Sequence, residues 1–213
     1  MAPAQGRQTR KRLATRQKIS DAATRLFIER GFDGVTVDEI AEAADVSRMT
    51  VFNHFSRKED MFFDLDEVGR EDLLTALRQR ERGVSPMEAL RLFAHQAVSE
   101  QRPYARFFEA GSDKFMATIQ ASEALKARAR AIRDELSDLL AAALGRCAKG
   151  GLPDSAASLA ASLLLATWTV AITEAHRAYE QDKNAEKAYQ AFLRLVDQGT
   201  KGVQAALEGT PYV

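Results

Sequence analysis

The 213-residue chain contains a single cysteine, Cys147. One cysteine excludes an intramolecular disulfide framework, and this scarcity is typical of proteins that function in a reducing compartment. We therefore expect a cytoplasmic location. The thiol fits a small buried apolar group or an inert surface group better than a catalytic nucleophile.

Histidine is also scarce, with three residues: His54, His95 and His176. None has the partner spacing of an ExxH or HExxH motif, and the chain has neither a glycine-rich phosphate loop nor a GxSxG motif. We therefore expect no metal ion and no cofactor, and we do not expect an enzyme.

No stretch of useful length alternates between apolar and polar residues as a strand does, and no internal repeat or low-complexity tract occurs. Apolar residues make up 46% of the chain and recur at helical spacing, which predicts an all-α fold with a substantial core. Residues 155–173 are uncharged, but six of these nineteen residues are serine or threonine. This composition favours a helix buried on both faces over a membrane span.

The net charge of the chain is zero, because Lys and Arg together number 30 and Asp and Glu together also number 30. Residues 1–20 nevertheless carry six basic side chains and no acidic one, which is a local patch that suits nucleic acid. No apolar segment of a signal peptide follows. Residues 1–12 are polar and without periodicity, which predicts a disordered basic arm. Such an arm either contacts DNA or remains solvated.

Residues 36–55, TVDEIAEAADVSRMTVFNHF, predict two short helices joined by a tight turn. Thr36 and Glu39 are spaced as a capping box, which marks the start of the first helix. Ser47 is a second N-cap, and it predicts a helix from Arg48 to His54.

The second of these helices has one apolar stripe, Val51 and Phe55, that would pack on the first helix. The opposite stripe carries Met49, Thr50 and Asn53. Arg48 lies at the N-terminal tip, and Phe52 and His54 flank the stripe. An amide, a hydroxyl, a guanidinium and apolar groups on a narrow helix suit the base edges of the DNA major groove. The alternative, a solvated face, would favour Glu and Lys over exposed Met and Phe.

Residues 19–63 resemble the N-terminal domain of the TetR family of bacterial transcriptional repressors. The resemblance rests on AxxLFxxxGF, TVxxIAxxA, VSxxTxxxHF and SRKE, and it covers about 45 residues. It implies a helix-turn-helix that binds double-stranded operator DNA, a homodimer and a small-molecule effector. The family commonly has tyrosine where this chain has Phe52, so one phenolic phosphate contact is absent. Together with the exposed stripe, the resemblance predicts DNA contacts from nine residues: Thr36, Ser47, Arg48, Met49, Thr50, Phe52, Asn53, His54 and Lys58.

The chain is expected to divide into four parts. The basic arm covers residues 1–12, and the DNA-binding domain covers 13–56, where a helix over about 15–30 ends at Gly31. A second capping box, at Ser56 and Glu59, predicts a linker helix over 57–82. Residues 83–213 are expected to form a helical domain that binds an effector and dimerises.

In this last part, helices are predicted over about 86–101, 117–144, 155–180 and 185–207. The last two would form a four-helix interface in a homodimer. The predicted interface residues are Leu163, Trp168, Phe192, Leu195, Val196, Gly199 and Val203. Aromatic and soft side chains from several helices predict an apolar ligand pocket lined by Phe93, Phe107, Phe108, Phe115, Met116 and Trp168.

The sequence therefore favours a homodimeric transcriptional repressor that a small, largely apolar effector releases from a palindromic operator. Two alternatives stay open. One is a DNA-binding regulator without a small-molecule effector, which a protein partner controls or which is constitutive. The other is a helical-bundle enzyme.

Overall fold

The structure, a computed structural model, describes residues 3–105, 112–147 and 154–213. Within these ranges every regular element is a helix, as expected. The chain forms two compact units. Unit 1 comprises residues 1–64 and 114–129, and unit 2 comprises residues 65–113 and 130–213.

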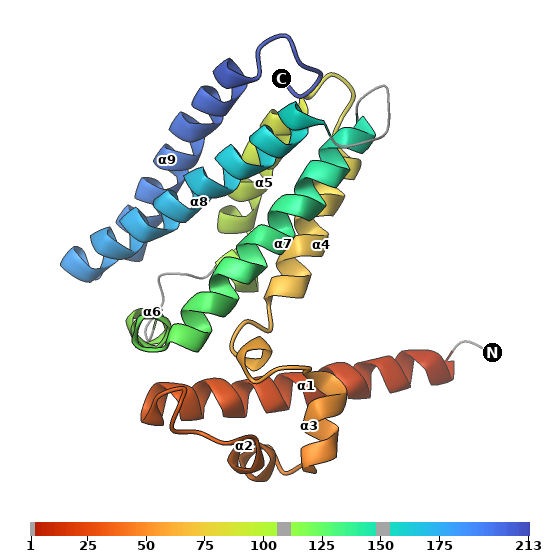
Figure 1. The fold of residues 1–213 in the computed structure, drawn as a ribbon, viewed down its shortest axis with the longest axis vertical. Coiled ribbons are helices and arrows are strands. Elements are labelled where there is room, and N and C mark those ends of the chain that lie inside the picture. Colours follow the sequence, from red (N-terminus) through yellow and green to blue (C-terminus); the bar gives the residue numbers. More distant parts are fainter. Residues whose placement is uncertain (1–2, 106–111, 148–153) are drawn as a thin grey trace. The chain divides into compact units, whose positions relative to one another are not determined.

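Unit 1 contains the three N-terminal helices (Figure 1). They are α1 (Pro3–Arg30), α2 (Val37–Ala43) and α3 (Arg48–His54), and the short 3-10 helix η1 (Glu59–Met61) follows. The start of α1 at Pro3 corrects the prediction of a disordered arm over residues 1–12. Proline is tolerated in a first helical turn, and the basic residues after it are good helix formers, so the helix extends beyond its buried part.

The core of unit 1 joins α1 to the two short helices. Ile19 and Phe27 of α1 are fully buried, as are Ile40 of α2 and Val51 of α3. The predicted capping box is confirmed: Glu39 N donates to Thr36 Oγ1 over 3.3 Å, and Thr36 N donates to Glu39 Oε2 over 2.8 Å. These local interactions determine where α2 begins.

A segment from much later in the chain completes this core. The ring of Phe115 stacks on that of Phe62 with centroids 4.1 Å apart and an interplanar angle of 7°, and Leu125 is fully buried in the same cluster. Arg128 Nε donates to Asp60 Oδ1 over 2.8 Å. Phe115 and Met116, predicted to line a ligand pocket in the C-terminal domain, instead pack in the core of unit 1.

The linker helix predicted over residues 57–82 is shorter and starts later. After η1 the chain turns, and α4 runs over Asp66–Arg78 without a side-chain cap. Burial of Met61 and Phe62 in unit 1 explains the turn, because a helix continuous from residue 57 would place these neighbours on different faces.

Unit 2 is built from longer helices. They are α4, α5 (Pro86–Ser99), η2 (Pro103–Ala105), most of α7 (Glu123–Cys147), α8 (Ser155–Asp182) and α9 (Ala185–Ala206). The predicted helix over 117–144 is divided at Ser122 into α6 (Ser112–Ala121) and α7. Gly69 in α4 packs on Tyr104, where a Cβ would lie at the ordinary contact distance of 3.4 Å from the ring.

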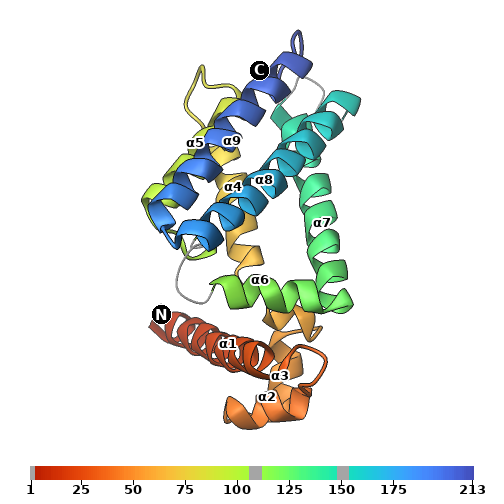
Figure 2. The same cartoon turned by 90° about the vertical axis from the view of Figure 1, so that its left-hand side faces the viewer.

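Helices α8 and α9 lie side by side along their lengths (Figure 2). By length and composition α8 could cross a membrane, but helices in the cores of soluble proteins pass the same test. Its alanines at 157, 160, 161, 171 and 175 are fully buried within the unit. One side of α8 is thus covered by its own unit, while only 33% of its most apolar stretch is buried.

The same packing corrects the predicted dimer interface. Phe192, Val196 and Val203 are buried inside the protomer, so their side chains are not available to a partner subunit. Helical spacing identified an apolar face of α9, but the neighbour that covers this face belongs to the same chain.

Gly199 of α9 lies directly against Thr167 of α8. A Cβ at Gly199 would lie 2.1 Å from Thr167 Cγ2 and 2.7 Å from Thr167 Oγ1, whereas a Cβ at Gly202 would meet nothing within 4 Å. Thr167 Oγ1 donates to Leu163 O over 2.9 Å, which restrains its rotation. Gly199 therefore permits the contact, and Gly202 does not take part in it.

We predict that Gly199→Ala destabilises the protein by about 1–3 kcal/mol through overpacking. Gly202→Ala is the matched control and should be neutral or stabilising by up to about 1 kcal/mol through helix propensity. Thermal unfolding followed by far-ultraviolet circular dichroism measures both. Adding Thr167→Ala to Gly199→Ala should recover part of the loss, and equal stability of the two glycine variants would contradict the assignment.

Candidate nucleic-acid interface

The turn between α2 and α3 determines where α3 points. Asp45 adopts a positive φ of 49°, which aspartate tolerates better than most residues, and Val46 N donates to Ala41 O over 3.0 Å. Ser47 then caps α3, accepting a hydrogen bond from Thr50 N over 3.1 Å. The tight turn and the N-cap at Ser47 together give the two helices the predicted helix-turn-helix arrangement.

Helix α3 buries one side and exposes the other. Val51 is fully buried and Phe55 is 2% exposed, whereas Met49 is 68% exposed and Phe52 is 45% exposed. Asn53 is exposed on the same outer side. Large apolar groups beside an amide on an open face are unusual for a solvated helix and indicate a surface that binds a partner.

Arg48 is the first residue of α3, and its guanidinium is ion-paired across the turn. Arg48 Nη1 lies 2.8 Å from Asp38 Oδ2 of α2, and the guanidinium carbon is 5.5 Å from the centroid of the Phe52 ring. A cation at a helix N-terminus is electrostatically unfavourable, so Asp38 compensates an otherwise unfavourable placement.

The hydroxyls of Thr36 and Ser47, both predicted to contact DNA, hold the starts of α2 and α3. Thr36 Oγ1 donates to Glu39 Oε2 over 2.8 Å, and Ser47 Oγ lies 2.8 Å from Thr50 Oγ1. The Thr36 amide, with the Arg30 guanidinium beside it, lowers the pKa of Glu39 to about 2. The α2 cap therefore remains charged and intact near neutral pH.

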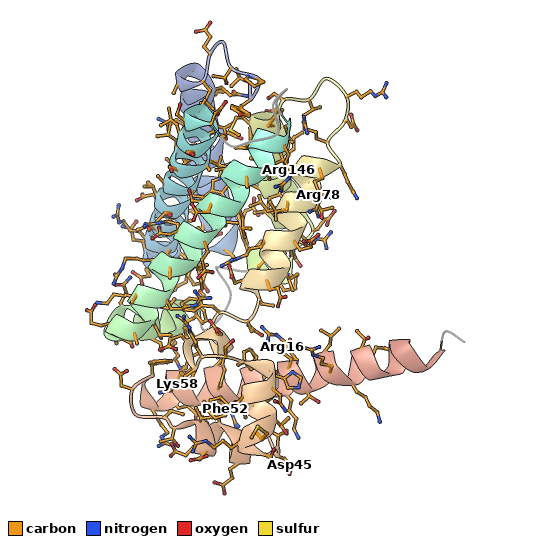
Figure 3. The ribbon with its side chains drawn as sticks, turned by 45° about the vertical axis from the view of Figure 1, so that its right-hand side comes forward. Arg16, Asp45, Phe52, Lys58, Arg78 and Arg146 are labelled. Atoms are coloured by element: carbon orange, nitrogen blue, oxygen red, sulfur yellow. The ribbon has the colours of Figure 1, made fainter. Side chains whose placement is uncertain are left out.

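The C-terminal end of α3 is held by a residue that the sequence analysis did not identify. Arg16 of α1 donates from Nη1 to His54 O over 2.6 Å, and its guanidinium carbon lies 4.2 Å from the centroid of the Phe55 ring (Figure 3). A cation is favourable at this end of a helix. Burial, followed by the charges of Arg12 and Arg16, lowers the pKa of His54 and so favours its neutral imidazole.

Lys58, predicted to contact DNA, is half-buried and directed inward. Its Nζ donates to Phe32 O over 2.5 Å and lies 4.1 Å from the centroid of the Phe32 ring. Burial lowers the pKa of this ammonium, and Asp33, Glu59 and Glu39 partly offset the effect. An ammonium has three N–H donors, so a phosphate contact is compatible with the bond to Phe32.

The N-terminal part of α1 supplies an exposed basic surface in the same unit. Arg10, Lys11 and Arg12 are exposed on α1, and α1 continues past α3 towards the N-terminus (Figure 1). Arg12 is close enough to His54 of α3 to lower its pKa. The cationic Arg12 of α1 thus lies near the C-terminal end of α3.

The predicted ligand pocket is brought together only in part. Phe93 of α5 lies nearly parallel to Tyr104 of η2 and to Trp168 of α8, with centroids 6.2 Å away in both cases. Trp168 Nε1 is buried and has no hydrogen-bond partner among the described residues. Phe107 and Phe108 lie outside the described residues.

An open hollow of about 540 Å³ lies along α9, but none of the residues predicted to form the ligand pocket lines it. Its lining residues are Gln190, Leu193, Arg194, Asp197, Gln198 and Lys201. In the part of the chain that the structure describes, no group of three or more His, Cys, Asp or Glu residues could hold a metal ion.

Comparison with known proteins places residues 19–65 in a family model described as bacterial regulatory proteins of the TetR family. The transcriptional regulator TcmR of Streptomyces glaucescens is 35% identical over 85 residues, which are 40% of this chain and 38% of that protein. The transcriptional repressor AcnR of Corynebacterium glutamicum is 43% identical over 58 residues, which are 27% of this chain and 29% of that protein. The similarity therefore spans less than two fifths of these curated relatives.

Solved structures extend the likeness of fold beyond the matched segment. The structure titled SmeT-Triclosan complex has a TM-score of 0.56 at 22% identity, covering 91% of both chains. NalD, the secondary repressor of the MexAB-OprM multidrug efflux pump in Pseudomonas aeruginosa, has a TM-score of 0.55 at 21% identity and covers 89% of this chain and 96% of its own. Residues 19–65 thus match the TetR family of bacterial regulatory proteins and have helix-turn-helix geometry, while the solved structures show a similar fold over about nine tenths of the chain.

Proposed function

We propose that the protein is a sequence-specific DNA-binding transcriptional regulator that represses genes beside its operator. The observation that carries this proposal is the outward face of α3, where Arg48, Met49, Phe52 and Asn53 are exposed above a buried Val51. The major groove admits an α-helix, and guanidinium, amide and apolar groups are the types that read base edges. The relatives carry the names of regulators and repressors, which supports a regulatory role in the cytoplasm rather than an enzymatic one.

We predict that Arg48→Ala and Asn53→Ala each weaken binding to the preferred sequence by about 1–3 kcal/mol and relax selection at one base pair. Lys58→Ala should weaken binding to all sequences alike and reduce the salt slope by about 1. The preferred sequence is first recovered from genomic fragments bound by the purified protein, and affinities are then measured at several salt concentrations.

Lys201→Ala is the charge-matched control, because Lys201 is an exposed residue of α9 in unit 2. It should leave DNA affinity unchanged. If Arg48→Ala and Asn53→Ala both bind the recovered sequence as tightly as the wild type, α3 is not the reading helix.

We also propose that the protein is a homodimer. The proposed interface is the exposed face of α8 and not the set of residues predicted from the sequence. Leu159 is 45% exposed and Val170 is 59% exposed on this face, which is uncharged over most of the helix. A two-fold axis would bring this self-complementary surface onto its own copy. The remaining exposed residues of the face are Ser155, Ser158, Ser162, Ala166, Thr169 and Thr173.

For the dimer, we predict that Val170→Arg yields a folded monomer that has lost specific DNA binding, because two half-sites are read together. Gln190→Arg, on the polar outer face of α9, is the control and should remain dimeric. Sedimentation velocity at micromolar concentration measures the state. A dimeric Val170→Arg variant, or a wild-type monomer that binds DNA specifically, would refute this interface.

The proposed effector is a small, largely apolar molecule that binds near Phe93, Tyr104 and Trp168 in unit 2. The near-parallel rings and the buried indole N–H without a partner support this placement, since such a donor is unsatisfied until an acceptor reaches it. An effector with a coupling free energy of about 1–3 kcal/mol would change operator affinity about 5- to 150-fold. The alternative is a DNA-binding regulator without a small-molecule effector.

We predict that a thermal-shift screen of apolar compounds yields one that both stabilises the protein and releases the recovered DNA. Trp168→Phe retains an aromatic ring but removes the donor, and it should weaken the response to that compound while leaving DNA affinity unchanged. A library in which every stabilising compound leaves DNA bound would favour the effector-free alternative.

A further inference from the structure

We propose that Asp38 is a specificity-determining residue of the DNA-binding surface, which orients Arg48 for base reading and opposes its binding to phosphates. The inference rests on the proposed function. It concerns a residue of α2 whose side chain, unlike those of the expected contacts, carries the same sign of charge as DNA.

The geometry indicates a positioning role. Asp38 Oδ2 accepts a hydrogen bond from Arg48 Nη1 over 2.8 Å, across the turn that joins α2 to α3. The Phe52 ring lies 5.5 Å from the guanidinium carbon and provides a second constraint on the same group. The guanidinium is thus held at the N-terminal end of the face that Met49, Phe52 and Asn53 expose.

The pair does little for stability, because both side chains are more than half exposed, at 59% and 64%. Exposed ion pairs contribute from about zero to 1 kcal/mol. The position of Arg48 at the start of α3 is itself unfavourable, since no acidic residue lies in the first turn of this helix. Folding explains the aspartate, which lies in the first turn of α2, but it gives no reason for an arginine at the start of α3.

Reading DNA gives such a reason. A guanidinium has five N–H donors in a planar fork, so a bond from Nη1 to Asp38 leaves donors for the two acceptors of a guanine edge. The carboxylate of Asp38 lies beside Arg48 and repels a phosphate that approaches the same guanidinium. Asp38 thereby lowers the sequence-independent part of the affinity more than the base-specific part.

The experiment compares Asp38→Asn with the wild-type full-length protein on two DNA probes. One probe is the sequence recovered by selection, and the other is a random-sequence duplex of equal length. Asp38→Asn is nearly isosteric and keeps an acceptor, so the fold is preserved, which thermal unfolding checks. We expect binding to the random duplex to strengthen about two- to fivefold, in line with the loss of one exposed ion pair. We also expect selection at one base pair to relax.

Glu42→Gln is the matched control, because it removes a charge of the same sign from an exposed position of the same helix. It should leave base selection unchanged. The decisive comparison is a double-mutant cycle, in which Asp38→Asn should have no effect on base selection in the Arg48→Ala background.

The outcomes are distinguishable. If the wild type selects a sequence and Asp38→Asn selects it with the same ratio, the role of Asp38 is refuted while the proposed function stands. An equal effect of Asp38→Asn in the Arg48→Ala background would likewise refute it. If the wild type binds no duplex at all, the proposed function fails and this inference fails with it.

Discussion

The burial of Val51 and Phe55 in the core of unit 1 is the constraint on which the rest of the candidate site depends. Because these two side chains are buried, the helical period turns Met49, Phe52 and Asn53 outward. Arg16 stabilises the same arrangement from α1, by capping the end of α3 and covering the Phe55 ring. A short helix of seven residues could not hold this orientation alone.

Local sequence signals predicted what is local in the structure. The capping box at Thr36 and the N-cap at Ser47 are each formed by side chains within three residues of the groups they satisfy. The same reasoning was wrong at Ser56 and Glu59, where tertiary burial of Phe62 overrides the local preference. The contact of Arg16 with His54 joins residues 38 apart, and no local pattern marks it.

Helical periodicity identifies an apolar face but not the element that covers it. Phe192 and Val196 were correctly placed on one face, yet the covering helices belong to the same protomer. Phe115 and Met116 were likewise predicted to line a ligand pocket, although they complete the core of the N-terminal helices. Which element covers an apolar face depends on the topology of the chain. The residue pattern within one helix carries no information about that topology.

The stacking of Phe115 on Phe62 has a consequence for synthesis on the ribosome. A nascent chain that has exposed α1, α2 and α3 still lacks residues 114–129, which belong to the same unit. The ring of Phe62 therefore remains partly uncovered until more than half of the chain has emerged. Unit 1, which presents α3, thus completes its core late in translation. A truncated product that ends before Phe115 would expose an aromatic surface instead of forming a complete domain.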